Sequence, residues 1–140
     1  MRLYLIHFCA LFAIALAFYY PGLDIALAVL YIMVLTAEGL AANFNSFTAR
    51  IAVASSLQIP GLLLATINLA RITQWDLSSY ALFILQYWYI PLTPLISLLT
   101  FVTEAGIPLY HYILLGLPFL MSVFFGAVMQ IGVKIRRRPL

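Results

Sequence analysis

The chain has 140 residues, of which 66% are hydrophobic and only 8% are charged. An ordinary soluble domain is roughly 45–50% apolar and about 25% charged, and a small fold could not cover so much apolar surface in water. The composition therefore excludes a soluble globular domain and indicates an integral membrane protein.

The N-terminal part of the chain contains two apolar runs. Leu3–Tyr20 is about 27 Å long as a helix, close to the thickness of a bilayer core. A signal peptide is the alternative interpretation, because Arg2 precedes this run and Ala15-Leu16-Ala17 resembles a cleavage site. Pro21-Gly22 then breaks the helix, and Leu23–Ala42 is the second predicted span.

Three further apolar runs follow, separated by short polar stretches: Ile51–Ala70, Tyr80–Phe101 and Tyr110–Val133. Each span should be helical, since an open sheet would leave unpaired backbone groups in hydrocarbon and the alternation typical of barrel strands is absent. We expect an all-α polytopic membrane bundle over residues 1–140, a single domain with short loops. Five transmembrane helices are predicted, with four as the alternative.

The basic residues near the C-terminus predict the orientation. The tail carries four of the seven basic residues, Lys134, Arg136, Arg137 and Arg138. Cytoplasmic segments are enriched in Lys and Arg, so we expect a cell-membrane protein with a cytoplasmic C-terminus. Five spans would place the N-terminus on the opposite side. Phospholipid headgroups are the expected partners of the tail. Nucleic acid is not expected, because no aromatic residues are interleaved with these cations.

Glu38 is the most informative polar residue, because a carboxylate within a span is expensive and usually has a partner or a function. It lies close to the end of the second run, and Arg50 begins the third run on the same side. An ion pair with Arg50 or with another polar group at that interface is the simpler interpretation. An ion or proton site, or a contact with a partner subunit, are the alternatives.

Polar and small residues recur at helical spacing in the last three runs. The candidates are Gln58, Gly61, Gln86, Ser97, Ser122, Gly126 and Gln130. Such stripes usually form the interface between packed membrane helices, where small residues allow close approach. A hydrated or ligand-lined cavity is the alternative. Pro60, Pro91, Pro94 and Pro118 remove backbone hydrogen bonds in the same runs and can kink them.

Two histidines offer a less favoured possibility. His7 and His111 would share one side of a five-span protein and could ligate haem or a metal ion. Neither has a second histidine at helical spacing, so we expect no metal or cofactor. Cys9 lies in an apolar stretch that disfavours its thiolate, and no nucleotide-binding or hydrolase motif occurs. Nothing in the sequence predicts an enzyme.

The fourth run contains several aromatic residues, including Tyr87, Trp88 and Tyr89, which provide large contact surfaces for another helix or a lipid. We therefore expect a non-enzymatic membrane protein that packs against other membrane chains, as a homo-oligomer or as an accessory subunit of a larger complex. A small transporter or channel that uses Glu38 and the polar stripes is the alternative. An intramembrane haem or metal protein is a third possibility.

Overall fold

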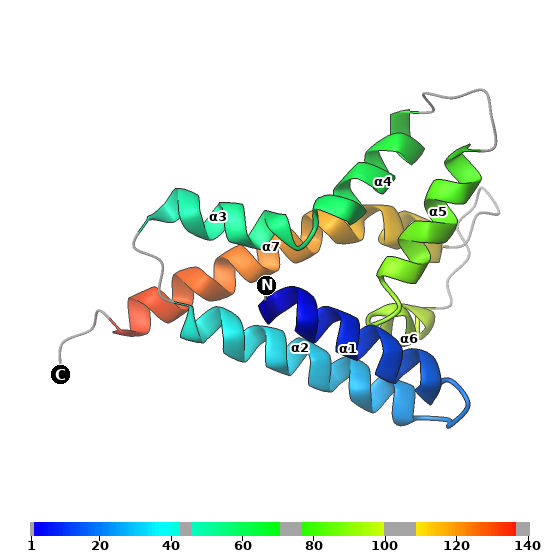
Figure 1. Ribbon diagram of the computed structural model, residues 1–140, viewed down its shortest axis with the longest axis horizontal. Coiled ribbons are helices and arrows are strands. Elements are labelled where there is room, and N and C mark those ends of the chain that lie inside the picture. Colours follow the sequence, from blue (N-terminus) through cyan, green and yellow to red (C-terminus); the bar gives the residue numbers. More distant parts are fainter. Residues whose placement is uncertain (1, 43–45, 71–76, 100–108, 137–140) are drawn as a thin grey trace.

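The computed structural model describes residues 2–42, 46–70, 77–99 and 109–136, and every regular element in these ranges is a helix (Figure 1). In chain order the elements are α1 (Arg2–Ala17), α2 (Leu23–Ala41), α3 (Phe47–Ser56), α4 (Ile59–Ala70), α5 (Leu77–Trp88), α6 (Thr93–Ser97) and α7 (Leu109–Arg136). The prediction of an all-α protein is confirmed for this part of the chain.

The first two helices form an antiparallel hairpin. The turn between them contains Gly22, whose φ of 85° lies in the left-handed region that residues with a Cβ rarely adopt. Leu23 N donates a hydrogen bond to Tyr20 O across this turn, at 3.1 Å. Because α2 runs back along α1, the start of α1 lies beside the end of α2.

The third predicted run is broken into two helices. The axes of α3 and α4 differ by 69°, and the break falls at Leu57 and Gln58. Pro60 does not itself mark the break. It lies in the first turn of α4, where a residue without an N–H is tolerated because that donor would have no partner within the helix. Ile51–Ala70 is therefore not a straight span as predicted.

The fourth predicted run is broken as well. Helix α5 has 12 residues, about 18 Å at the helical rise, whereas a bilayer core is about 30 Å thick. Pro91 follows within three residues of its end and disfavours helical backbone at the preceding residue. Helix α6 starts beyond it, with Pro94 in its first turn. In Figure 1, α5 runs steeply across the direction of α2 and α7.

The number of separate spans differs from the prediction of five. Within the described residues, α2 and α7 are each long and apolar enough to cross a membrane, and the α3–α4 pair would be a third if it is one span. Helix α1 is apolar but has only 16 residues. The apolar runs are thus present as helices, but breaks at residues 57–58 and 89–92 divide two of them.

Helices α2 and α7 lie side by side and form the axis of the bundle, while α3 packs on α7 and the α4–α5 hairpin projects away from it (Figure 1). Two glycines mark the close approach of α2 and α7. Gly132 faces the backbone of Leu40, and Gly39 faces the side chain of Val128. The largest core cluster contains Tyr31, Leu35, Leu57, Ala65, Leu85, Tyr89, Leu92, Ile96, Leu114, Leu117 and Met121.

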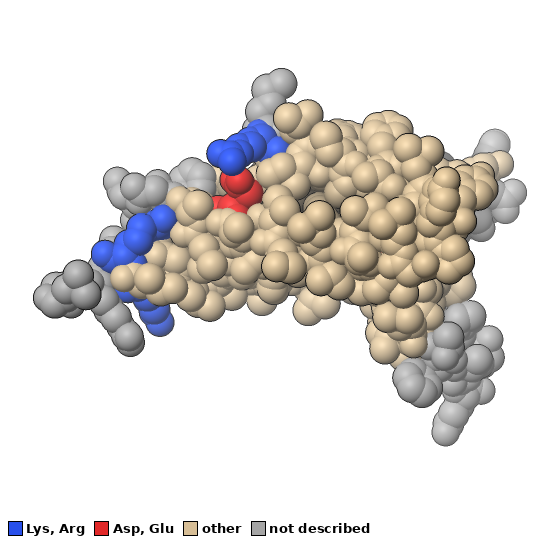
Figure 2. Space-filling model, turned by 90° about the horizontal axis from the view of Figure 1, so that it is seen from below, with Lys and Arg blue, Asp and Glu red and all other residues tan. Residues whose placement is uncertain are grey.

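Both ends of the described chain lie at the same end of the α2–α7 pair, whereas five crossings would place the termini on opposite sides of a membrane. Arg2 contacts Glu38, and Arg136 donates hydrogen bonds to the carbonyls of Ala41 and Ala42. The reason is the broken fourth run, which crosses the bundle axis and does not run its full length. On the face shown in Figure 2, the charged side chains gather at this end.

Candidate functional site

A polar cluster is buried where the two helix breaks meet the α1–α2 hairpin. It consists of His7 from α1, Tyr31 from α2, Gln58 at the first break and Tyr89 at the second, and all four side chains are buried. His7 Nδ1 and Tyr31 Oη are 2.7 Å apart and share a hydrogen bond. Tyr89 Oη donates to Gln58 Oε1 at 2.5 Å. Each hydrogen bond joins two segments distant in sequence, and the two pairs meet in the core cluster that contains Tyr31 and Tyr89.

Local sequence explains why the second pair forms. Helix α5 ends at Trp88, and the backbone turns there with a hydrogen bond of 2.8 Å from Leu92 N to Tyr89 O. This turn directs Tyr89 toward α4. Gly61 leaves the space it needs, because a Cβ at that position would lie 2.5 Å from Tyr89 Oη and 3.1 Å from its ring. The tyrosine therefore packs directly on the glycine backbone.

Aromatic rings enclose the histidine. The His7 ring lies 4.5 Å from the Trp88 ring between centroids, and the Phe8 ring meets Trp88 edge-on at 5.9 Å. These contacts join α1 to the end of α5. Because buried polar groups are costly without hydrogen bonds, the Tyr31 and Gln58 partners are what allow polar side chains at this depth. The cluster fastens the base of the α4–α5 hairpin to the rest of the bundle.

The chemistry available in the cluster is that of neutral hydrogen-bonding groups. It has no carboxylate, and within the described residues no group of three or more His, Cys, Asp or Glu side chains could hold a metal ion. His7 uses Nδ1 for Tyr31, while His111 lies in the first turn of α7 with its ring against Tyr110 at 5.6 Å. These two histidines have different neighbours among the described residues.

Removing one partner of the Tyr89–Gln58 hydrogen bond should be costly. Tyr89→Phe is expected to lower the free energy of unfolding by about 1–3 kcal/mol, because Gln58 Oε1 stays buried without its donor. Adding Gln58→Leu should recover much of this loss, since both positions are then apolar. Thermal denaturation in detergent of both single variants and the double variant measures the coupling. Simple additivity of the two losses would contradict it.

Glu38 is paired with Arg2, a polar group at that interface of the kind that the prediction allowed beside Arg50. Arg2 Nη2 and Glu38 Oε1 are 2.8 Å apart, and the two side chains are 79% and 24% exposed. The antiparallel hairpin explains the choice of partner, because it brings the first residue of α1 to the last turns of α2. Arg50 is buried near the start of α3, with its guanidinium carbon 6.0 Å from the centroid of the Phe47 ring.

The predicted polar stripe of the fourth run does not form a continuous face. Gln86 and Ser97 are exposed, and the break between α5 and α6 removes the helical register that would align them. The hydroxyl of Ser97 donates to Pro94 O and that of Ser122 to Pro118 O, each at 2.8 Å. These bonds stay within their own helices and do not join neighbours.

The remaining predicted positions on α7 lie along its partly buried side. Gln130 is half-buried, and a Cβ at Gly126 would lie 4.0 Å from Ala54 Cβ, which is ordinary contact. Lys134 and Arg136 lie in the last turn of the helix. Arg137 and Arg138 fall outside the described residues.

Sequence reasoning missed the tyrosines that complete the cluster. Tyr31 lies in the middle of an apolar run, and nothing in its sequence neighbours distinguishes it from a lipid-facing aromatic residue. Tyr89 was noted only as one of several aromatic residues in the fourth run. The available signal was Pro91 two residues later, since a proline there favours a turn that exposes the preceding residues to a neighbouring helix.

Comparison of the chain with protein-family models, with curated proteins and with solved structures gives no match. The contacts within the chain are therefore the basis for proposing what it does.

Proposed function

We propose that this chain is a non-enzymatic integral membrane protein that acts by helix packing, as an accessory subunit of a larger membrane complex or as a homo-oligomer. The observation that carries the proposal is the α4–α5 hairpin. Its inner face is packed against the core through Ala65 and Leu85, which are fully buried. Its base is fastened by the polar cluster of His7, Tyr31, Gln58 and Tyr89. The hairpin projects from the α2–α7 pair and carries exposed apolar side chains (Figure 1).

The outer face of the hairpin has the character of a contact surface. The exposed large side chains of α4 and α5 include Ile59, Leu63, Leu69, Tyr80, Phe83, Ile84 and Tyr87. The rings of Phe83 and Tyr87 lie 4.9 Å apart and form a T-shaped pair. Apolar area alone favours neither lipid nor protein inside a membrane, but rigid aromatic side chains provide contact area at little entropic cost and are enriched at protein interfaces.

The length of the hairpin helices also favours a partner. Each has 12 residues, about 18 Å, so neither crosses a bilayer core of about 30 Å alone. Backbone that turns at membrane depth is tolerated where protein covers it. The bundle itself covers the base of the hairpin, and a second chain along the outer face would cover the rest.

In the proposed arrangement the protein lies in the cell membrane with its basic end in the cytoplasm. The described cations are Arg2, Arg50, Lys134 and Arg136, and all four lie at the end where α2 ends, α3 begins and α7 ends. The positive-inside rule assigns such an end to the cytoplasm. Helices α1, α2 and α7 together with the bent α3–α4 pair then make an even number of crossings, and the α5–α6 segment returns without a fifth.

Truncation of one aromatic side chain on the outer face tests the packing role. Phe83→Ala is expected to weaken association with the co-purifying chain, or with a second copy, by more than tenfold, as for a central interface residue. The matched control is Phe119→Ala on α7, because both phenylalanines are about half exposed, at 58% and 50%. Mild-detergent purification from the native membrane, followed by mass spectrometry and sizing, measures the difference. Equal recovery of the complex with both variants would contradict the proposal.

A small transporter or channel is the second candidate, because two broken helices meet at a buried polar cluster, as they do around the binding sites of many transporters. Glu38, the carboxylate that a transporter of this kind would use, already forms an ion pair with Arg2. Flux of protons or alkali cations into proteoliposomes tests this alternative. Flux that Gln58→Leu abolishes would replace the packing proposal, and no flux above protein-free liposomes would reject transport of these ions. An absorbance band from the purified chain would instead support haem or metal.

A further inference from the structure

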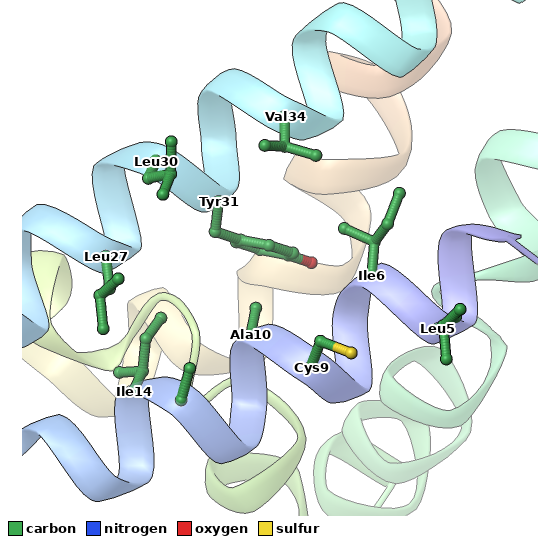
Figure 3. Close-up of a pocket in the computed structure, with 10 residues that line it drawn as sticks. Leu5, Ile6, Cys9, Ala10, Ile14, Leu27, Leu30, Tyr31 and Val34 are labelled. Atoms are coloured by element: carbon green, nitrogen blue, oxygen red, sulfur yellow. The ribbon is translucent and has the colours of Figure 1, made fainter.

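A groove of about 360 Å³ runs between α1 and α2 on the outer side of the hairpin (Figure 3). Its lining side chains are Leu5, Ile6, Cys9, Ala10, Ala13, Ile14, Leu27, Leu30, Tyr31 and Val34. The one hydroxyl among them, on Tyr31, is bonded to His7. The small side chains of Cys9, Ala10 and Ala13 hollow the α1 wall of the groove. It is apolar along its whole length.

Charged groups stand at one end of this groove. Arg2 lies three and four residues before Leu5 and Ile6, and Glu38 lies four residues after Val34, so both stand one helical turn beyond the lining on the same faces. Their ion pair of 2.8 Å joins α1 to α2 beyond that end, where both residues also line a second, more polar hollow with Val53, Phe125 and Met129. Arg2 is 79% exposed and uses Nη2 for this contact, while a guanidinium has five N–H donors. Donors therefore remain for an anion at the mouth of the groove.

We propose that the groove binds one acyl chain of a glycerophospholipid whose phosphate is held by Arg2. The apolar lining fits a hydrocarbon chain, and the cation at its mouth fits the phosphate that such a chain carries at the membrane surface. The α2 side of the lining, Leu27–Val34, extends about 10 Å along the helix and is open to the surrounding membrane. The charged mouth favours a lipid over a second apolar helix, which would bury Arg2 and Glu38 together.

This proposal rests on the membrane location within the proposed function, but not on the packing role of the α4–α5 hairpin. The groove is formed by α1 and α2, whereas the proposed contact surface is formed by α4 and α5. If the protein binds no lipid in the groove but still co-purifies with its partner chain, only the lipid proposal is wrong. Loss of partner binding in Phe83→Ala with normal lipid binding would leave it intact.

The experiment titrates delipidated, detergent-solubilised protein with dioleoylphosphatidylglycerol and counts bound lipids by native mass spectrometry. One lipid should bind more tightly than all others. Ala13→Leu, which fills the groove from an exposed position, and Arg2→Gln, which removes the phosphate donor, should each weaken that binding at least tenfold. Ala26→Leu, at an exposed site of α2 outside the groove, and Lys134→Gln, with the same charge change, should alter it less than twofold.

Two further measurements keep the result interpretable. Each variant is compared with the parent by circular dichroism and melting temperature, and a variant that has lost its fold is replaced by Ala13→Val or Arg2→Ala. Cys9 is the only cysteine and is exposed in the groove, so bound phosphatidylglycerol should slow its reaction with N-ethylmaleimide at least fivefold. Dioleoylglycerol, which lacks the phosphate, should protect it less.

Three results would overturn the proposal. Binding of phosphatidylglycerol to Ala13→Leu with the parent affinity would show that the groove is not the site. Equal binding of dioleoylglycerol and phosphatidylglycerol, unaffected by Arg2→Gln, would show that no phosphate is recognised. An unchanged rate of Cys9 alkylation at saturating lipid would show that the chain lies elsewhere.

Discussion

Replacing Gly132 by leucine is expected to separate α7 from α2 and to give the largest loss of stability of any single glycine replacement on α7. A Cβ at Gly132 would lie 2.5 Å from Leu40 O and 2.9 Å from Leu40 Cα. These are backbone atoms of a packed helix, so they cannot turn aside as the tip of a side chain can. Overpacking commonly lowers the free energy of unfolding by about 1–3 kcal/mol, and a leucine against backbone should reach or exceed the upper value.

Two glycines on the same helix provide matched controls. Nothing lies within 4 Å of a Cβ at Gly116, so Gly116→Leu should leave the melting temperature in detergent within about 2 °C of the parent. Gly126→Leu should fall between the two, because its nearest neighbour is the Ala54 side chain at 4.0 Å. Thermal denaturation of the three variants in one detergent measures the order. Similar melting temperatures for Gly132→Leu and Gly116→Leu would contradict the close approach.

The position of this contact shows a limit of spacing arguments. Pro118, Ser122, Gly126 and Gln130 recur every four residues and were expected to share the interface. A residue advances about 100° around a helix, so each step of four turns the stripe by about 40° and carries it off a straight contact line. The buried side of α7 combines steps of three and four residues, through Pro118, Met121, Phe125, Met129 and Gly132. Which of these residues face the interface depends on where α2 packs against α7, and the sequence of α7 alone does not determine that.

The sequence indicated that some of the predicted helices would be broken, but it did not locate the breaks. Pro60, Pro91 and Pro94 correctly marked the third and fourth runs as irregular, whereas α7 continues through Pro118. The first break lies before Pro60, at Leu57 and Gln58. There the Gln58 carboxamide accepts a hydrogen bond from Tyr89, a residue 31 positions away. A break stabilised by such a distant partner cannot be located from local sequence, because apolar composition is equally compatible with a straight helix.

The orientation argument shows which part of the sequence reasoning holds and which part fails. The prediction of a cytoplasmic C-terminus rested on the basic residues of the tail, and in the structure Arg2 and Arg50 lie at the same end as Lys134 and Arg136. The side of the N-terminus depended instead on counting spans. Counting five assumed that each apolar run of about 20 residues crosses a bilayer. The fourth run has the composition of a span, but the structure divides it into α5 and α6, and neither helix is long enough to cross a bilayer core alone.

Reporter fusions at the two termini are expected to give the same reading, cytoplasmic at both ends. The Arg2–Glu38 ion pair of 2.8 Å and the hydrogen bond of 3.0 Å from Arg136 to Ala41 O bring both ends of the described chain to the end of α2. No arrangement that preserves these two contacts can place the N-terminus and the C-terminus on opposite sides of a bilayer. A reporter active only in the cytoplasm, such as green fluorescent protein, and one active only outside, such as alkaline phosphatase, distinguish the two cases.

Changing the charge of the turn between α1 and α2 should change the readings of the same reporter fusions. Placing two lysines in the turn between α1 and α2, as Tyr20→Lys with Leu23→Lys, should weaken or invert the orientation of that hairpin, because it balances the cations at the other end. Neutral Tyr20→Asn with Leu23→Asn is the matched control and should leave both readings cytoplasmic. Opposite readings from the two termini of the unmodified chain would restore five crossings. They would require α1 to leave its ion pair with α2, and the even number of crossings would be wrong.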